Sequence, residues 1–308
     1  MALAAEYAAM FEQLAATPGP AITEMSPAEG REMYRLMRPL NPDISVGGIE
    51  DRTITGPGGD ITLRVYTPEG EGPFGIYINF HGGGWVIGDL DTADASCRDL
   101  CNQANCIVVS VDYRLAPEHA YPAAVEDSYA ATSWVSENTS SLGGNGKLAV
   151  GGESAGGNLA AVVALKARDE GGPAIDFQLL AYPVVDADLT RQSYIDNGED
   201  YLLTTQSMRW FWDYYCPDAA NRTQPEVSPI HAASHAGLPP ALIVTAEFDP
   251  LRDEGEAYAQ MLSQAGVEAR SIRFDGLVHD FFATAQLFEA SGQAFTQVAE
   301  ILRDVLAK

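Results

Sequence analysis

The sequence predicts an α/β protein with a mostly parallel sheet and helices on both of its faces. Short apolar runs alternate along the chain with longer stretches of helical pattern. The runs carry apolar residues at successive positions, which is typical of strands buried on both faces. The 308 residues suffice for one large domain whose core needs neither disulfide nor metal. The expected strands of this sheet cover residues 75–80, 107–111, 148–151, 177–182, 241–246 and 269–274.

The chain begins with two expected helices. Four apolar residues recur at helical spacing within residues 1–17, namely Leu3, Tyr7, Phe11 and Leu14. This helix is either docked on the domain or part of a lid, and the pattern alone favours neither. A second helix is expected from Ser26, because Pro27 and Glu29 complete a capping box with a first-turn proline, and Pro39 and Pro42 end it.

Further elements follow in order. Residues 61–65 alternate apolar and polar after a Gly-rich turn, so a hairpin with residues 53–55 is expected. Helices are expected at 155–168, 253–264 and 291–306. The segment 185–224 is irregular and aromatic, with one helix expected at 205–215. It is either a lid over the site or an ordinary helical layer.

Composition excludes several function classes. The formal charge is −25 with three lysines, Lys147, Lys166 and Lys308, so nucleic-acid and anionic-membrane binding are not expected. No apolar run reaches 18 residues, and no basic region precedes the apolar N-terminus, so neither a membrane helix nor a signal peptide is expected. The four cysteines, which include Cys97 and Cys101 one helical turn apart, are interpreted as buried thiols of a reduced cytoplasmic protein.

A G-x-S-x-G motif marks a candidate nucleophile. Gly152-Glu153-Ser154-Ala155-Gly156 lies between an expected strand and an expected helix. This is the context of a nucleophile elbow, in which the serine sits on a sharp turn between the two elements. Small neighbours are needed because the turn is tight and the helix packs close to the strand. Ser154 is therefore the predicted nucleophile.

The serine needs a base, and the base needs an orienting carboxylate. His279 follows an expected strand in a loop with glycine, and is favoured strongly over His231 and His235. Asp249 directly follows the strand 241–246, at the strand end where ligand chemistry is expected. Asp275 remains the second choice for the carboxylate, whereas Asp253 and Glu254 are typical of a first helical turn.

A glycine run supplies the expected oxyanion hole. His81-Gly82-Gly83-Gly84-Trp85 follows the strand 75–80. Backbone amides of Gly82 and Gly83, together with that of Ala155, are the predicted donors. His81 is expected to hold the loop by a hydrogen bond and not to act as a second base.

Taken together, these motifs resemble the bacterial hormone-sensitive lipase family of carboxylesterases. The resemblance extends through most of the chain and is carried by residues 81–89, 112–118, 121–123, 152–160, 228–229 and 249–254. It implies an α/β-hydrolase core of eight strands, at 46–184 and 226–308, with a helical cap from 1–45 and 185–225. It also implies that Ser154, Asp249 and His279 form the triad, that Gly82, Gly83 and Ala155 form the oxyanion hole, and that 112–118 buttresses the oxyanion loop.

The resemblance implies hydrolysis of carboxylic esters with no metal or other cofactor, and it allows a homodimer. Two positions depart from the family: Glu153 stands where aspartate is common, and Asp280 where glycine is common. Both flank predicted catalytic residues, so they could tune rate or pH response. Trp85 and the aromatic cluster near Trp210 suggest an apolar pocket for short or medium acyl chains, with Trp85 as a substrate-binding residue.

Three other functions remain alternatives. The same machinery could hydrolyse amides or catalyse another acyl transfer. A non-catalytic binding protein is also conceivable, since plant gibberellin receptors resemble the family but lack its catalytic histidine, which here is present as His279. A structural protein on the same fold would leave the triad and the glycine loop unexplained.

Overall fold

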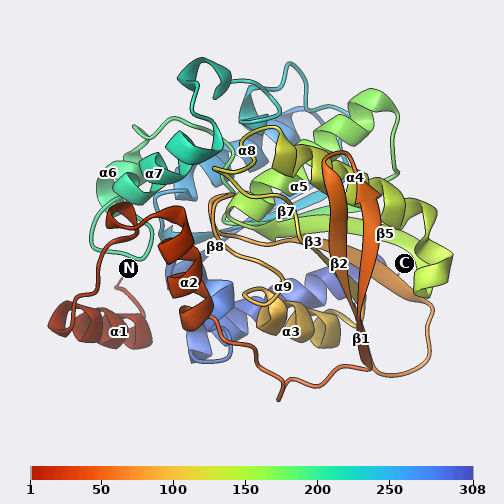
Figure 1. Ribbon diagram of the computed structural model, residues 1–308, viewed down its shortest axis with the longest axis horizontal. Coiled ribbons are helices and arrows are strands. Elements are labelled where there is room, and N and C mark those ends of the chain that lie inside the picture. Colours follow the sequence, from red (N-terminus) through yellow and green to blue (C-terminus); the bar gives the residue numbers. More distant parts are fainter. Residues whose placement is uncertain (1, 308) are drawn as a thin grey trace.

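The computed structural model describes residues 2–307, so Met1 and Lys308, the outer ends of the predicted terminal segments, lie outside the described residues. Eight strands form one sheet in the order β1-β2-β4-β3-β5-β6-β7-β8 (Figure 1). The strands are β1 (Gly48–Gly56), β2 (Gly59–Thr67), β3 (Phe74–Phe80), β4 (Ile107–Val111), β5 (Gly144–Glu153), β6 (Phe177–Ala181), β7 (Ala241–Phe248) and β8 (Ala269–Val278). The predicted eight-stranded sheet is thereby confirmed.

The sheet is parallel from β4 to β8. The hairpin of β1 and β2 is antiparallel, with Ile54 opposite Ile61, and β2 joins β4 antiparallel. Strands β4 and β6 are buried at every position, as expected for strands covered on both faces. Strand β8 has one neighbour and alternates between exposed and half-buried residues over most of its length, which is typical of an edge.

Helices cover both faces of the sheet. Helices α3 (Asp94–Ala104) and α9 (Glu289–Leu306) pack together on one face. Helices α4 (Ala123–Glu137), α5 (Ala155–Glu170) and α8 (Arg252–Gln264) cover the other face. The expected alternation places helices between most of the strands, but the sequence analysis gave no residue range for α3 or α4. All four cysteines are buried free thiols, as the sequence indicated.

Two separate segments gather beyond the carboxyl ends of the strands (Figure 1). The first holds α1 (Ala5–Ala16), the short 3-10 helix η1 (Ile22–Glu24) and α2 (Pro27–Met37). The second holds α6 (Gln192–Asn197) and α7 (Thr205–Tyr215), and α7 contacts η1. The predicted capping box starts α2: Ser26 N–H donates to Glu29 Oε2 at 2.8 Å, and Glu29 N–H donates to Ser26 Oγ at 3.3 Å.

Helix α1 docks on the domain through Tyr7. The Tyr7 hydroxyl hydrogen-bonds to Ser291 Oγ at 2.8 Å and to Thr284 Oγ1 at 2.6 Å, and the residue is fully buried. The active-site cavity described below is lined from this part of the chain by η1 and α2. Within residues 2–307, no helix combines the length and apolarity that crossing a bilayer requires.

Candidate active site

Ser154 occupies the sharp turn between β5 and α5. Its backbone has φ 57° and ψ −115°, a conformation that side chains other than glycine rarely adopt. Its N–H donates to Ala181 O of β6 at 2.9 Å, which ties the turn to the neighbouring strand. The strained turn points the hydroxyl away from the strand and into the cavity, as expected for a nucleophile elbow.

The glycines on either side of Ser154 permit this turn. A Cβ on Gly152 would lie 2.1 Å from Phe80 O, and one on Gly156 would lie 1.8 Å from the same atom. No side chain fits at either position, because the start of α5 packs directly against β3. This agrees with the small residues that the sequence analysis required around the serine.

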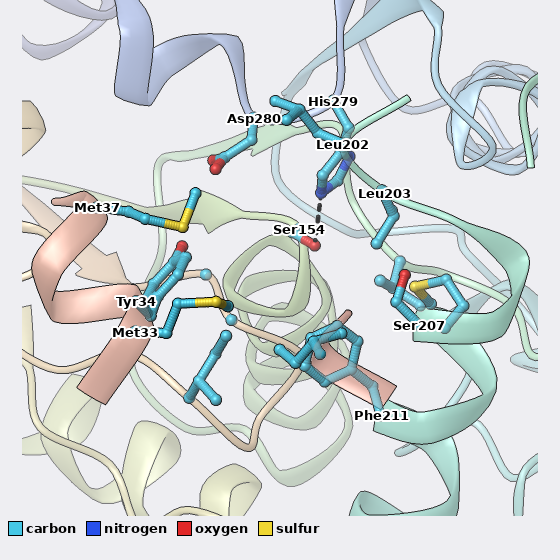
Figure 2. Close-up of a pocket in the computed structure, with 17 residues that line it drawn as sticks. Met33, Tyr34, Met37, Ser154, Leu202, Leu203, Ser207, Phe211, His279 and Asp280 are labelled. Atoms are coloured by element: carbon cyan, nitrogen blue, oxygen red, sulfur yellow. Dashed lines mark hydrogen bonds between the residues drawn. The ribbon is translucent and has the colours of Figure 1, made fainter. Parts of the chain in front are cut away.

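The structure brings Ser154, His279 and Asp249 together, and Figure 2 shows the contact between Ser154 and His279. His279 Nε2 lies 3.1 Å from Ser154 Oγ, and His279 Nδ1 lies 2.8 Å from Asp249 Oδ2. The second oxygen of Asp249 accepts the N–H of Leu251 at 2.8 Å, so the carboxylate is fixed on both sides. Since Nδ1 donates to a carboxylate, Nε2 is left free to accept the serine proton.

The residues considered as alternatives for the base and the carboxylate make other hydrogen bonds. The hydrogen bond of His279 Nδ1 goes to Asp249 and not to Asp275. His231 Nε2 contacts Asp186 Oδ1 at 3.0 Å, and His235 Nε2 contacts Pro229 O at 3.0 Å. Glu254 is buried at the start of α8 and accepts the N–H groups of Val185 and Asp186. It therefore holds the chain after β6.

The surroundings of His279 make it more basic than usual. Burial favours the neutral ring and lowers its pKa, but the charge of Asp249 and the hydrogen bond to it act in the opposite direction and outweigh burial. The net result is a raised pKa. A raised pKa suits a base that must accept the serine proton and then return it.

Two of the three predicted oxyanion donors line the same cavity, and the third, Ala155, directly follows Ser154. Gly82 and Gly83 follow β3 and line the cavity together with Ser154. Gly83 has φ +117°, and a Cβ there would lie 2.2 Å from Ile87 O, so the loop requires glycine. The amide of Ala155 is the first of α5 and has no acceptor within the helix. These three amides are thus available for a ligand oxygen.

His81 supports the glycine loop, as the sequence analysis expected. Its Nδ1 lies 2.8 Å from Gly82 O, and its carbonyl accepts the Tyr113 hydroxyl at 2.8 Å. Burial lowers its pKa to about 4, so the ring is neutral at neutral pH and Nδ1 donates to Gly82. Tyr113 belongs to the segment 112–118, and Ala116 of that segment donates to Trp85 O at 2.9 Å.

Trp85 does not line the cavity. Its indole is fully buried, stacked on Tyr215 with ring centroids 4.0 Å apart, and tilted against Trp212. The backbone of Trp85 has φ 60°, which turns the side chain towards these α7 residues. The interpretation of Trp85 as a substrate-binding residue is therefore corrected. Its side chain packs the glycine loop against α7, outside the cavity.

The cavity has a volume of about 240 Å³, and its walls are mainly apolar. Figure 2 shows Ser154 between side chains of α2 on one side and side chains of α7 on the other. Both predicted cap segments therefore contribute to the site. The lining residues from these segments are Ile22, Met33, Tyr34, Met37, Leu202, Leu203, Ser207, Met208 and Phe211.

Sequence reasoning missed one charged residue next to the site. Arg38, at the end of α2, pairs with Asp280 and lies 3.9 Å from Glu153 Oε2. The signal was present in the sequence, because Arg31, Arg35 and Arg38 are spaced to share one face of a helix. What they would face depends on how the helix packs, which the spacing does not reveal.

The chain is similar to many curated proteins and solved structures. A family model described as alpha/beta hydrolase fold matches residues 77–283. The carboxylic ester hydrolase LipN of Mycobacterium tuberculosis is 46% identical over 87% of this chain and 73% of its own length. Its esterase LipI is 43% identical over 87% of this chain and 85% of its own length.

Solved structures agree. A thermostable esterase from Pseudomonas putida is 42% identical, with a TM-score of 0.95 over 99% of this chain and 98% of its own. A hyperthermophilic esterase from Pyrobaculum calidifontis is 40% identical, with a TM-score of 0.93 over 99% of both chains. The chain belongs to the α/β-hydrolase family, among its bacterial hormone-sensitive lipase-like carboxylesterases.

Proposed function

We propose that this protein hydrolyses short- to medium-chain carboxylic esters through an acyl-enzyme on Ser154. The observation that carries the proposal is the hydrogen-bonded series Ser154–His279–Asp249, with Ser154 and His279 facing a small apolar cavity. A serine hydroxyl is a weak nucleophile at its ordinary pKa, and this series supplies both the base and its orientation.

In the first half of the reaction, Ser154 Oγ attacks the ester carbonyl carbon while His279 Nε2 takes the hydroxyl proton. Asp249 stabilises the imidazolium that forms. The carbonyl oxygen becomes an oxyanion, which accepts hydrogen bonds from the amides of Gly82, Gly83 and Ala155. The bond to the alkoxy oxygen then breaks, and the alcohol leaves with the proton from His279.

In the second half, water replaces the alcohol. His279 removes a proton from the water as its oxygen attacks the acyl carbon, and a second oxyanion occupies the same amides. Collapse of this intermediate breaks the bond to Ser154 Oγ, which recovers its proton from His279. The products are the carboxylic acid and the free enzyme.

The size of the cavity supports small substrates. Its volume of about 240 Å³ lies below the range of about 300–1,000 Å³ typical of pockets for drug-sized ligands. One relative, 36% identical, is named an ethyl acetate hydrolase, and another at 36% is named an arylesterase. Both names denote esterases, and the first denotes a small ester.

The segments 1–45 and 185–225 together form the cap in this proposal. Both contribute side chains to the cavity wall, which supports a shared role in shaping it. The reduced cysteines support a cytoplasmic location, and the family resemblance allows a homodimer. Sedimentation at several concentrations tests the dimer, and a monomer at all of them would refute it.

The central test is hydrolysis of p-nitrophenyl esters from acetate to palmitate by wild type and by Ser154→Ala. We expect activity that is highest on short and medium chains and lost in the variant. Folded wild-type protein that cleaves none of the esters would refute the proposal. Preferential cleavage of the matching p-nitroanilides would instead favour an amidase.

A further inference from the structure

Helix α2 carries three arginines along one face, and the burial of their side chains increases from the exposed Arg35 to the largely buried Arg38. Arg31, Arg35 and Arg38 are spaced by four and three residues, which places them on one side of the helix. Arg31 donates from Nε to Val86 O and from a terminal nitrogen to Ala116 O, both at 2.8 Å. Arg35 pairs with Asp89 at 2.5 Å. These contacts fix α2 to the segments that support the glycine loop.

Arg38 reaches further into the site than the other two. Its guanidinium pairs with Asp280 and lies 3.9 Å from Glu153 Oε2, and it stacks over the Tyr34 ring at 4.5 Å from the ring centroid. Asp280 directly follows His279, and Glu153 directly precedes Ser154. One side chain from α2 therefore touches the chain neighbours of both reacting residues.

Most of this arrangement is buried, and Asp280 is its most exposed member at 25% of its side chain. Arg38 exposes 12% of its side chain and Glu153 exposes 7%. The hydroxyl of Tyr182, the residue after β6, donates to Glu153 Oε2 at 3.0 Å, while its ring meets the His279 ring edge-on at 4.9 Å between centroids. Besides Asp249, which belongs to the triad, the carboxylates of Glu153 and Asp280 thus lie next to the reacting residues. Arg38 contacts both of them.

We propose that Arg38 is a positioning residue, which neutralises Asp280 and Glu153 and thereby keeps the Ser154–His279 pair in its reactive geometry and charge state when α2 is seated. This inference rests on the proposed role of His279 as the base. It explains how two acidic residues can stand beside the triad without trapping His279 as an imidazolium. It also makes the catalytic competence of the triad depend on the packing of α2 against the core.

The proposal has a signature in pH that packing alone lacks. Burial, Asp249, Asp280 and Arg38 all act on the pKa of His279: Asp249 and Asp280 raise it, whereas burial and Arg38 lower it. Glu153, whose own pKa is raised chiefly by burial, the Tyr182 ring and Tyr34 also face this region, and the Arg38 charge lowers the pKa of His81 as well. Loss of the Arg38 cation must therefore raise the pKa of His279, and loss of the Asp280 charge must lower it.

The experiment measures kcat/KM for p-nitrophenyl acetate as a function of pH. Its readout is the acid limb of the profile, where activity rises as His279 loses its proton. The proteins compared are wild type, Arg38→Met, Arg38→Lys, Asp280→Asn and the double variant Arg38→Met/Asp280→Asn. We expect the limb to move up by roughly 0.5–1 pH unit in Arg38→Met and down in Asp280→Asn. Arg38→Lys keeps the charge, so its limb stays near wild type while kcat falls. The double variant returns the limb towards wild type.

A control on the same helix face separates charge at this site from charge on α2. Arg35→Met removes an arginine that pairs with Asp89, and we expect its limb to stay in place. Equal losses of kcat in Arg38→Met and Arg38→Lys, with the limb unmoved in both, would overturn the proposal and leave Arg38 a packing residue.

A second readout does not depend on turnover. The imidazole of His279 is titrated by NMR in the same variants, where the same order of pKa values is expected. If the wild type cleaves no ester, but the pKa of His279 shifts in the variants as stated, the proposed function is refuted and the electrostatic role of Arg38 stands. An unshifted titration in an active enzyme would refute only the role of Arg38.

Discussion

The ring of His81 lies parallel to the ring of Tyr113, with centroids 4.2 Å apart and planes 13° from one another. The Tyr113 hydroxyl also donates to the carbonyl of His81 at 2.8 Å. Because His81 immediately precedes Gly82, this tyrosine fixes the start of the glycine loop. The position of the proposed oxyanion donors thus depends on a side chain from the segment after β4.

Tyr113→Phe should lower kcat and leave KM for p-nitrophenyl acetate nearly unchanged. The substitution keeps the stacked ring and removes the donor to a buried carbonyl, a change that costs about 1–3 kcal/mol where the carbonyl stays unsatisfied. Part of this cost appears as a loop whose amides no longer fit the oxyanion, so we expect a loss of about 10-fold in kcat. Steady-state kinetics measure it.

Tyr258→Phe is the matched control for this change. The Tyr258 hydroxyl is buried in α8, and it has no hydrogen-bond partner among residues 2–307. Its removal should leave both stability and kcat at wild-type levels or above. Equal losses in the two variants would mean that the effect of Tyr113→Phe does not come from the hydrogen bond to His81.

Burial of the His81 ring leads us to expect a loss of stability in acid. Its pKa is about 4 in the folded protein, against an ordinary value of about 6.5. Between these values the unfolded chain binds a proton that the folded chain refuses, so stability present above about pH 6.5 is lost as the pH falls towards 4. The full effect is about 3 kcal/mol.

Urea unfolding at a series of pH values measures this effect in wild type and in His81→Gln. The wild type should lose stability more steeply than the variant between about pH 6.5 and 4, whatever the difference in stability at pH 8. Parallel curves for the two proteins would contradict the buried, neutral state of His81.

The fold, and the placement of Ser154, His279 and Asp249 beside one another, could be predicted because they depend on local patterns. Continuous apolar runs indicate the central strands, and the chemistry of a parallel sheet gathers at the strand ends, where Asp249 and His279 lie. Trp85 shows the limit of such reasoning. Its side-chain direction depends on a backbone φ of 60° and on Tyr215 from a distant helix, and neither is encoded near position 85.

Arg38 shows the same limit for charge. Its spacing indicates a charged helix face, but a charged face is usually a solvated one. Whether the arginines meet water or buried carboxylates depends on the packing of α2 against the core. The departures at Glu153 and Asp280 were visible as departures, and their common partner was not.

Asp249→Asn tests the orienting carboxylate. An amide in place of the carboxylate no longer stabilises the imidazolium and favours the wrong tautomer of His279, so kcat should fall by about 10³–10⁴-fold. Asp275→Asn is the matched control, since Asp275 is an exposed acid on β8 close to His279 in sequence. A loss larger for Asp275→Asn than for Asp249→Asn would reassign the carboxylate.

Two helical glycines should respond to alanine with opposite signs. A Cβ on Gly30 of α2 would meet Ile87 Cγ2 at 3.5 Å, an ordinary contact, so Gly30→Ala should stabilise by about 0.5–1 kcal/mol through helix propensity. A Cβ on Gly292 of α9 would lie 2.8 Å from the backbone oxygen of Ala285, so Gly292→Ala should destabilise by about 1–3 kcal/mol. Chemical denaturation of both variants measures the difference, and shifts of the same sign would contradict it.

The Phe211 side chain should limit the length of acyl chain that the cavity accepts. Its ring, on α7, lines the cavity and packs directly on Gly84, where an added Cβ would lie 2.1 Å from the ring. Phe211→Ala removes this wall and extends the cavity towards α7. We expect the preferred p-nitrophenyl ester to shift to longer chains, because the space released can bury additional methylenes at about 0.8 kcal/mol each.

A control on the same helix separates this effect from loosening of α7. Tyr214 is partly buried, packs on Trp210 and is absent from the cavity wall, so Tyr214→Ala should keep the wild-type order of chain lengths. The measurement is kcat/KM along the ester series in both variants. Each added methylene should raise kcat/KM by up to about 4-fold in Phe211→Ala until the new space is filled. A longer preferred chain in Tyr214→Ala as well would show that mobility of α7, and not the volume of the Phe211 ring, sets the limit.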